Sequence, residues 1–139
     1  MPTEAQALWA FLPLGYLLTV LIETPVLLAG LSARHPFRHR LFAGLWLTAC
    51  TYPVVILVFP LVIDRGEHPA LYYWVAETFA PLAECALFWA AFGKRELVGT
   101  RSMWRDLAAV TAANLASFGL GELGFELGVL DWMSPRFYQ

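Results

Sequence analysis

The sequence predicts an all-α fold, a bundle of four transmembrane helices that forms a single integral membrane domain over residues 1–139. Hydrophobic residues make up 59% of the chain and charged residues 14%, against roughly 45–50% and about 25% in an ordinary soluble domain. A soluble globule of 15.6 kDa has too much surface to bury so many apolar side chains. The composition therefore excludes a soluble cytosolic enzyme, a disordered chain and a disulfide scaffold.

Four apolar stretches, at 7–31, 41–63, 70–93 and 104–128, are the expected helices in chain order. Each has the ~20 apolar residues that a helix needs to cross a hydrocarbon core about 30 Å thick. The first stretch has no basic segment before it and is longer than the apolar core of a signal peptide. We therefore expect it to be the first membrane helix.

The basic residues predict how these helices are oriented. Seven of the 9 lie in the first and third connections between helices: Arg34, Arg38, Arg40, Lys94, Arg95, Arg101 and Arg105. The second connection, 64–69, holds only Arg65. Because cytoplasmic loops are rich in Lys and Arg, we expect the first and third connections to face the cytoplasm. Both termini and the second connection would then face outward from the inner (plasma) membrane.

Aromatic residues predict the same spans, because Trp and Tyr gather at the headgroup level of a bilayer. An outer belt is expected from Trp9, Trp74 and Trp132, together with Tyr72, Tyr73 and Tyr138. An inner belt is expected from Trp46, Trp89 and Trp104.

The two halves of the chain share a polar pattern. In the first half Glu23 precedes Arg34 by 11 residues, and in the second Glu84 precedes Arg95 by the same interval. The second helix of each half carries a polar pair three residues apart, followed by a helix breaker: Thr48 and Thr51 before Pro53, Asn114 and Ser117 before Gly119. The pattern fits two parallel helical-hairpin repeats about an axis along the membrane normal. Chance similarity between two apolar hairpins is the alternative.

Five acidic residues lie in the interior of the apolar stretches: Glu23, Glu77, Glu84, Glu122 and Glu126. An acid at the centre of a span costs about 2.5–3.5 kcal/mol on insertion scales, so they require an explanation. With a rise of 1.5 Å per residue, Glu23 and Glu84 lie ~13 Å from the inner ends of their helices, and Thr51 and Asn114 lie ~15 Å from theirs. These residues predict one polar layer in the middle of the membrane.

A second layer is expected nearer the outer ends of the helices. Glu77 precedes Glu84 by one heptad and so lies on nearly the same helix face. Glu122 lies at a similar distance from the outer end of the fourth helix, and Glu126 lies one turn further out.

The candidate proton- or cation-binding residues are therefore Glu23, Glu84, Glu77, Asn114, Thr51, Thr48, Ser117 and Glu122. Nearby prolines at 25, 53 and 81 free backbone carbonyls, and an all-oxygen set of ligands suits protons or hard cations. Two carboxyls held close in a low dielectric cannot both ionise cheaply, so we expect Glu23 and Glu84 to share a proton near neutral pH. The same acids also fit uncharged packing contacts between helices, or contacts with a partner subunit.

Smaller motifs give further expectations. Gly121, Gly124 and Gly128 form a small-residue pattern that favours close helix packing, within the chain or between chains. Cys50 and Cys85 lie inside predicted spans and are expected to be apolar packing residues, with an intramembrane disulfide or thiolate pair as the alternative.

His35 and His39 are spaced as metal ligands on one helix face would be. Pro36 lies between them and three arginines surround them, so a basic loop against anionic headgroups is the favoured interpretation. No phosphate-binding glycine loop, nucleophile elbow or zincin motif is present in the sequence.

Two resemblances follow from these residues. In its length and in the lone Glu23 of its first helix, the chain resembles the small multidrug exporters, which also have four helices. This chain has four further intramembrane acids, so we do not carry the function of those exporters over to it. Glu23 and Glu84, with the Thr and Asn/Ser pairs of the other two helices, resemble uncharacterised small four-helix bacterial inner-membrane proteins. That resemblance implies the fold and no established activity.

The expected function is the handling or transport of protons or cations through the carboxylate cluster. The alternative is a non-enzymatic accessory or assembly subunit that packs against a larger membrane complex. An enzyme is disfavoured because no nucleophile and base are paired in the sequence, so no catalytic residues are named. We expect no cofactor and no nucleic acid, and the sequence does not identify a metal. The expected partners are the lipid bilayer and either a second copy or a partner membrane subunit.

Overall fold

The structure is a computed structural model that describes residues 4–133, and within this range all regular elements are helices. In chain order they are α1 (Glu4–Gly30), α2 (Phe37–Pro53), η1 (Val54–Val58), α3 (Phe59–Val62), α4 (Pro69–Phe92), η2 (Arg95–Leu97), α5 (Arg101–Glu126) and η3 (Asp131–Met133). Tyr138, which was assigned to the outer aromatic belt, lies outside the described residues.

The four predicted helices are present, and the all-α class is confirmed. Three of them are long and apolar enough to cross a membrane: Ala5–Gly30, Phe37–Val62 and Pro69–Phe92. The fourth, α5, has 26 residues and is as long as these. It is more polar because Arg101, Arg105 and Asp106 lie in its first turns and Glu122 and Glu126 near its last.

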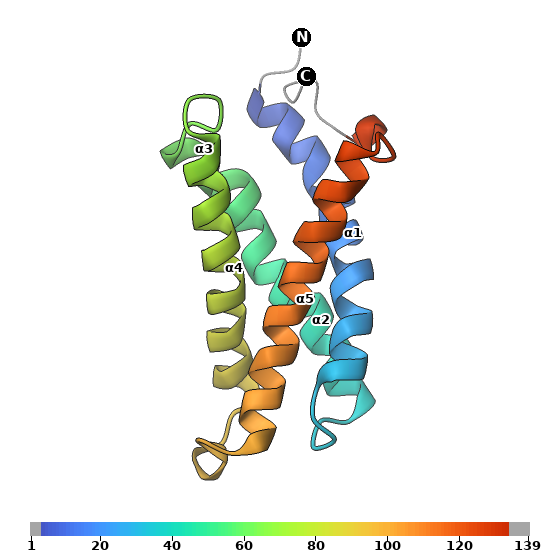
Figure 1. Ribbon diagram of the computed structural model, residues 1–139, viewed down its shortest axis with the longest axis vertical. Coiled ribbons are helices and arrows are strands. Elements are labelled where there is room, and N and C mark those ends of the chain that lie inside the picture. The colour runs from blue at the N-terminus through green and yellow to red at the C-terminus, as the bar shows by residue number, and fades with distance from the viewer. Residues whose placement is uncertain (1–3, 134–139) are drawn as a thin grey trace.

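The long helices run side by side, and successive ones point in opposite directions (Figure 1). The α1–α2 and α4–α5 connections lie at one end of the bundle, which we call the basic end. The start of α1, the α3–α4 connection and the end of α5 lie at the other, which we call the mouth end. Helix α1 packs against α2 and α5, and α4 packs against the same two helices.

Small residues allow the helices to approach closely on both sides of α1. A Cβ on Gly30 would lie 2.9 Å from the Cβ of Ala109 on α5, and a Cβ on Gly44 of α2 would collide with the hydroxyl of Thr24. A side chain at either glycine would force the helices apart.

The apolar core occupies the half of the bundle nearer the basic end. It consists of Leu27, Leu31, Ala43, Leu47, Phe88, Ala109, Val110 and Ala113. Large apolar side chains also point away from the bundle at mid-helix, such as Leu21, Leu82 and Leu115, which are 63%, 65% and 56% exposed. Exposure of this kind over a whole surface suits a hydrocarbon environment and not water.

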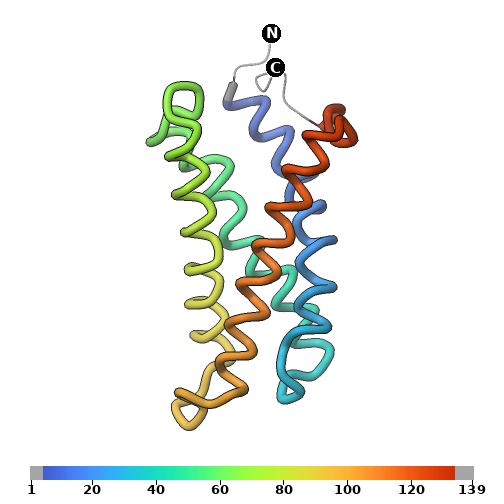
Figure 2. The backbone as a smooth tube through the Cα atoms, viewed as in Figure 1, coloured from blue at the N-terminus to red at the C-terminus, as the bar shows by residue number. Residues whose placement is uncertain are grey.

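The segment Phe37–Val62 runs obliquely, starting beside α1 at the basic end and finishing beside α4 at the mouth end (Figure 2). Its helix widens after Pro53 into the π-turn η1, where the N–H of Phe59 donates to the carbonyl of Val54. Proline has no N–H to donate and its ring crowds the preceding turn, which favours such a change of pitch. The hydroxyl of Tyr72 donates to the carbonyl of Val55 at 2.9 Å and so ties α4 to this turn.

Candidate functional site

Glu23 lies in the middle of α1 and is 2% exposed. Its two carboxyl oxygens each have a hydroxyl neighbour. Thr48 Oγ1 of α2 lies 2.7 Å from Glu23 Oε2, and Ser117 Oγ of α5 lies 2.6 Å from Glu23 Oε1. Glu23 is therefore held between two helices that are far apart in the sequence.

Glu84 lies in the middle of α4 and is 1% exposed. Thr51 Oγ1 of α2 lies 2.6 Å from Glu84 Oε1. The side-chain amide of Asn114 on α5 donates to Glu84 Oε2 at 2.7 Å. Each buried glutamate thus has one partner on α2 and one on α5, and the partners on each helix are three residues apart.

The hydroxyl partners can serve a carboxyl group in either protonation state. Thr48 Oγ1 lies 2.9 Å from the carbonyl of Gly44, and Thr51 Oγ1 lies 3.1 Å from that of Leu47. A hydroxyl has one hydrogen to donate and can also accept. It can therefore donate to an ionised glutamate, or donate to the backbone carbonyl and accept from a protonated one. Ser117 can likewise donate to either group, since its Oγ lies 2.9 Å from the carbonyl of Asn114.

Both glutamates line a cavity of about 450 Å³ that continues toward the mouth end. Its lining includes Arg65 of the α3–α4 connection and Asp131 of η3, both of which belong to that end. Aromatic side chains form much of the wall: Phe11, Tyr52, Tyr72, Tyr73, Phe118 and Phe125. The carboxyl pair is thus reached from one end of the bundle.

A second pair of acids, Glu77 of α4 and Glu122 of α5, lines the same cavity between the carboxyl pair and the mouth. Among residues 4–133, neither of them has a hydrogen bond or an ion pair to another side chain. Arg65 lies beyond them. It donates to the hydroxyl of Tyr73 at 2.6 Å, and its guanidinium lies 4.9 Å and 5.1 Å from the ring centres of Tyr72 and Tyr73.

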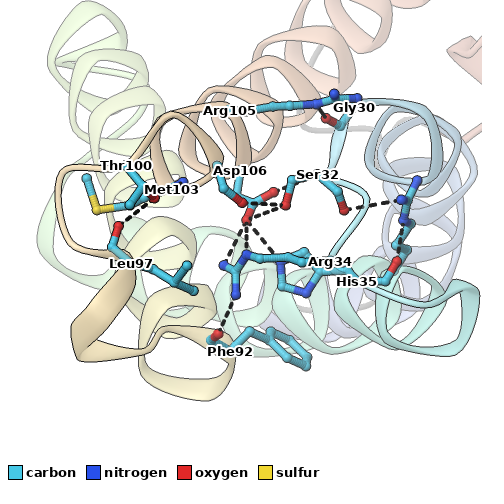
Figure 3. Close-up of polar contacts among 12 residues, drawn as sticks. Gly30, Ser32, Arg34, His35, Phe92, Leu97, Thr100, Met103, Arg105 and Asp106 are labelled. Carbon is cyan, nitrogen blue, oxygen red and sulfur yellow. Dashed lines mark hydrogen bonds and ion pairs between the residues drawn. The ribbon is translucent and has the colours of Figure 1, made fainter.

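The other end of the bundle is closed by a polar cluster around Asp106, which is 1% exposed (Figure 3). The backbone N–H of Ser32 donates to Asp106 Oδ1 at 2.6 Å. Arg34 approaches Asp106 Oδ2 with Nε at 2.9 Å and Nη2 at 2.8 Å, and it also donates to the carbonyl of Phe92. The α1–α2 connection is therefore fastened to both α5 and the end of α4.

His35 completes this cluster, with Nε2 2.9 Å from Asp106 Oδ2. Its ring also meets the rings of Phe88 and Phe92 edge to face. Burial lowers the pKa of His35 below its usual 6.5, although the hydrogen bond to Asp106 opposes this shift. The neutral imidazole donating from Nε2 is the form that this arrangement favours.

The sequence analysis missed Asp106. An acid one turn into a helix, directly after a connection rich in arginine, is the signal that could have found it. His35 and His39 are not paired on a metal: His35 bonds to Asp106, and His39 lies against the ring of Phe92. Within residues 4–133, no group of three His, Cys, Asp or Glu side chains is placed to hold a metal ion.

All eight residues that were proposed from the sequence for the proton or cation site lie in the lining of the one cavity: Glu23, Thr48, Thr51, Glu77, Glu84, Asn114, Ser117 and Glu122. Glu126 is exposed and is absent from the lining.

The glycines of the small-residue motif do not make the close helix contacts that were expected within the chain. Gly128 lies beyond the end of α5 with φ +71°, and the N–H of Leu130 donates to the carbonyl of Gly124. Gly128 ends the helix, because glycine adopts positive φ without strain. A Cβ on Gly121 would meet nothing within 4 Å. Cys50 and Cys85 are both free thiols, so the disulfide alternative is wrong.

Comparisons of this chain with protein-family models, with curated proteins and with solved structures found no match.

Proposed function

We propose that this protein is a membrane protein that binds and moves a cation in exchange for a proton at the Glu23–Glu84 pair. The observation that carries the proposal is that two buried carboxyl groups, on different helices, line one cavity that leads to one end of the bundle. Packing contacts alone do not require a cavity beside the acids.

The hydrogen bonds around the pair support exchange. Two neighbouring carboxyls in a low dielectric cannot both ionise cheaply without a cation, so at least one of them holds a proton when the site is empty. The hydroxyls of Thr48, Thr51 and Ser117 can each donate or accept, as their second neighbours show. They can therefore stabilise the protonated pair, and equally the ionised pair when a cation replaces the proton.

The partners also support two hairpin repeats related by a pseudo-two-fold axis. Glu23 bonds to the first polar residue of its own hairpin, Thr48, and to the second of the other, Ser117. Glu84 bonds in the same way to Asn114 and to Thr51. A site on such an axis between two repeats is the place where transporters bind substrate. In this proposal α5 is the fourth span, and the basic end faces the cytoplasm.

Transport assays in liposomes test the proposal. Vesicles that contain the purified protein and a pH-sensitive dye receive sodium, potassium, magnesium, methylammonium or diaminohexane outside, each with a permeant anion. The wild type should alkalinise the lumen in response to at least one of these cations, because each cation that enters is exchanged for protons that leave. Glu23→Gln and Glu84→Gln should fold and lose this response, because an amide keeps the hydrogen bonds but cannot exchange a proton.

Glu126→Gln is the matched control, since Glu126 is an intramembrane acid outside the cavity, and it should retain the wild-type response. If Glu23→Gln and Glu84→Gln behaved as the wild type does, the acids would be packing groups and the proposal would be wrong. Co-purification of a stoichiometric membrane partner, with no response to any cation, would favour the accessory subunit instead.

A further inference from the structure

We infer that the cation is a linear aliphatic diamine or short polyamine, with one terminal ammonium at the Glu23–Glu84 pair and the other at Glu77 and Glu122. The inference rests on the proposed function, because it names the chemical class that the same cavity takes.

The cavity has two acidic layers and not one. Glu77 and Glu84 both line it and are seven residues apart on α4, which places their backbones ~10.5 Å apart along the helix axis. The acids of the outer layer have no hydrogen-bond or ion-pair partner among the described residues, so no cationic side chain of that part of the chain pairs with them. A ligand with a positive charge at each end would satisfy both layers at once.

On α4 and α5, the wall between the two layers is apolar. Ala80 and Pro81 lie between Glu77 and Glu84 along α4, and Phe118 lies between Ser117 and Glu122 along α5; all three line the cavity. Such a wall favours a methylene chain over a row of water molecules or polar groups. Arg65, the basic side chain of the lining, lies beyond the outer layer and is bonded to Tyr73.

Two other classes of cation fit less well. A bare metal ion needs several close ligands, and within residues 4–133 no group of three His, Cys, Asp or Glu is placed to supply them. A cavity of about 450 Å³ is also within the range of roughly 300–1,000 Å³ that is typical of sites for organic molecules. A cation with a single charge would leave one of the two acidic layers unpaired.

The separation of the layers sets the length of the ligand. An extended chain advances roughly 1.2 Å per bond, because three backbone bonds span at most about 3.6 Å. An ammonium that sits between the layers lies about 2.8 Å from its carboxylate oxygens, so the two nitrogens must span about 7.7 Å with one ammonium placed there and ~10.5 Å with both level with their acids. The two terminal nitrogens should therefore be separated by about six to nine bonds.

Isothermal titration calorimetry on the detergent-purified chain tests this directly. The probes are the diamines from diaminopropane to diaminooctane, with an amine on each terminal carbon, and hexylamine as the single-headed control. The wild type should bind diaminohexane or diaminooctane about tenfold more tightly than either diaminopropane or hexylamine, as expected for one further charge-assisted contact.

Variants assign each end of the ligand. In Glu77→Gln/Glu122→Gln, the ratio of the hexylamine and diaminohexane dissociation constants should fall to near unity. Glu84→Gln should bind both hexylamine and diaminohexane more weakly than the wild type does. Glu126→Gln should bind both amines with the wild-type affinities. Equal affinity of the wild type for hexylamine and diaminohexane would overturn the inference. A proton response in liposomes to an inorganic cation, together with no amine binding in calorimetry, would also overturn the inference. Neither of these two results would contradict the proposed function. The absence of a response to any cation would instead overturn the proposed function.

Discussion

Around Glu23 and Glu84, the hydroxyl groups determine what the carboxyls can do. Thr51 Oγ1 lies 2.6 Å from Glu84 and 3.1 Å from its own helix's Leu47 carbonyl, so its single hydrogen can serve either. Asn114 adds a fixed donor to the other oxygen of Glu84. An acid with such partners can be buried in either protonation state, which is the property that exchange requires.

Replacing Thr51 with valine removes one of these partners at nearly constant volume. Because Glu84 is then left with a single donor, Thr51→Val should lower the free energy of unfolding by about 1–3 kcal/mol. Thr78→Val is the control, since Thr78 is exposed and bonds only to the Trp74 carbonyl of its own helix; it should change stability by less than about 0.5 kcal/mol. Unfolding in mixed detergent measures both. Equal effects of the two substitutions would show that the Thr51–Glu84 contact contributes nothing.

The buried imidazole of His35 predicts a pH dependence of stability. Its pKa is lowered in the folded protein by burial, so the unfolded chain takes up a proton that the folded chain does not. The contribution of His35 to stability is complete above the unfolded pKa of about 6.5 and is lost as the pH falls from there to the lower folded value. Unfolding should therefore show a larger loss between neutral and mildly acidic pH in the wild type than in His35→Gln. Parallel profiles would contradict this.

Among the elements, the α1–α2 connection has the most specific attachment. Asp106 of α5 accepts from Ser32, Arg34 and His35 of this connection, and Arg34 reaches the carbonyl of Phe92 at the end of α4. At the basic end, the α1–α2 connection is thus attached to both α5 and the end of α4, whereas the mouth end has a cavity. In a transporter this fastening would have to loosen for the site to be reached from the basic end.

Removing Asp106 should be costly, because Arg34 and His35 would lose their shared partner in a buried place. Asp106→Ala should lower the free energy of unfolding by about 3–5 kcal/mol. Glu96→Ala, at an exposed acid of the same end, should be within about 0.5 kcal/mol of the wild type. Thermal unfolding in detergent compares them. A change of less than about 1 kcal/mol for Asp106→Ala would show that the cluster adds little to the fold.

The sequence allows some of these elements to be predicted and not others. Apolar length located all four helices, and the depth of Glu23 and Glu84 predicted that they share a layer, because a helix rise converts position into depth. The prolines had unequal effects: Pro25 and Pro81 lie within continuous α-helices, and Pro53 is followed by a π-turn. The position of Asp106 after an arginine-rich connection is a local signal, but its contacts join residues 71 to 74 apart in the sequence, so its partners could not be predicted from a local pattern.

For the whole molecule, the distribution of basic residues predicts one orientation in the membrane. The basic end holds Arg38, Lys94 and Arg95, and the mouth end holds Arg65 and the acids near it. With the basic end in the cytoplasm, the carboxyl pair would be reached from outside.

Cysteine labelling in intact cells tests this orientation. In a chain with Cys50 and Cys85 replaced by alanine, Glu67→Cys at the mouth end should react with a membrane-impermeant maleimide, and Val98→Cys at the basic end should react only after the cells are opened. Both positions are exposed. Labelling of position 98 but not 67 in intact cells would reverse the orientation.

We propose that Glu23 and Glu84 hold a proton that a cation displaces, and infrared difference spectroscopy observes that proton directly. Addition of a cation that is active in liposomes, at neutral pH, should remove the absorption of a protonated carboxyl group and add that of a carboxylate. The change should be absent from Glu23→Gln/Glu84→Gln and present in Glu126→Gln. A wild-type spectrum without loss of a protonated carboxyl, or the same loss in the double variant, would contradict the claim.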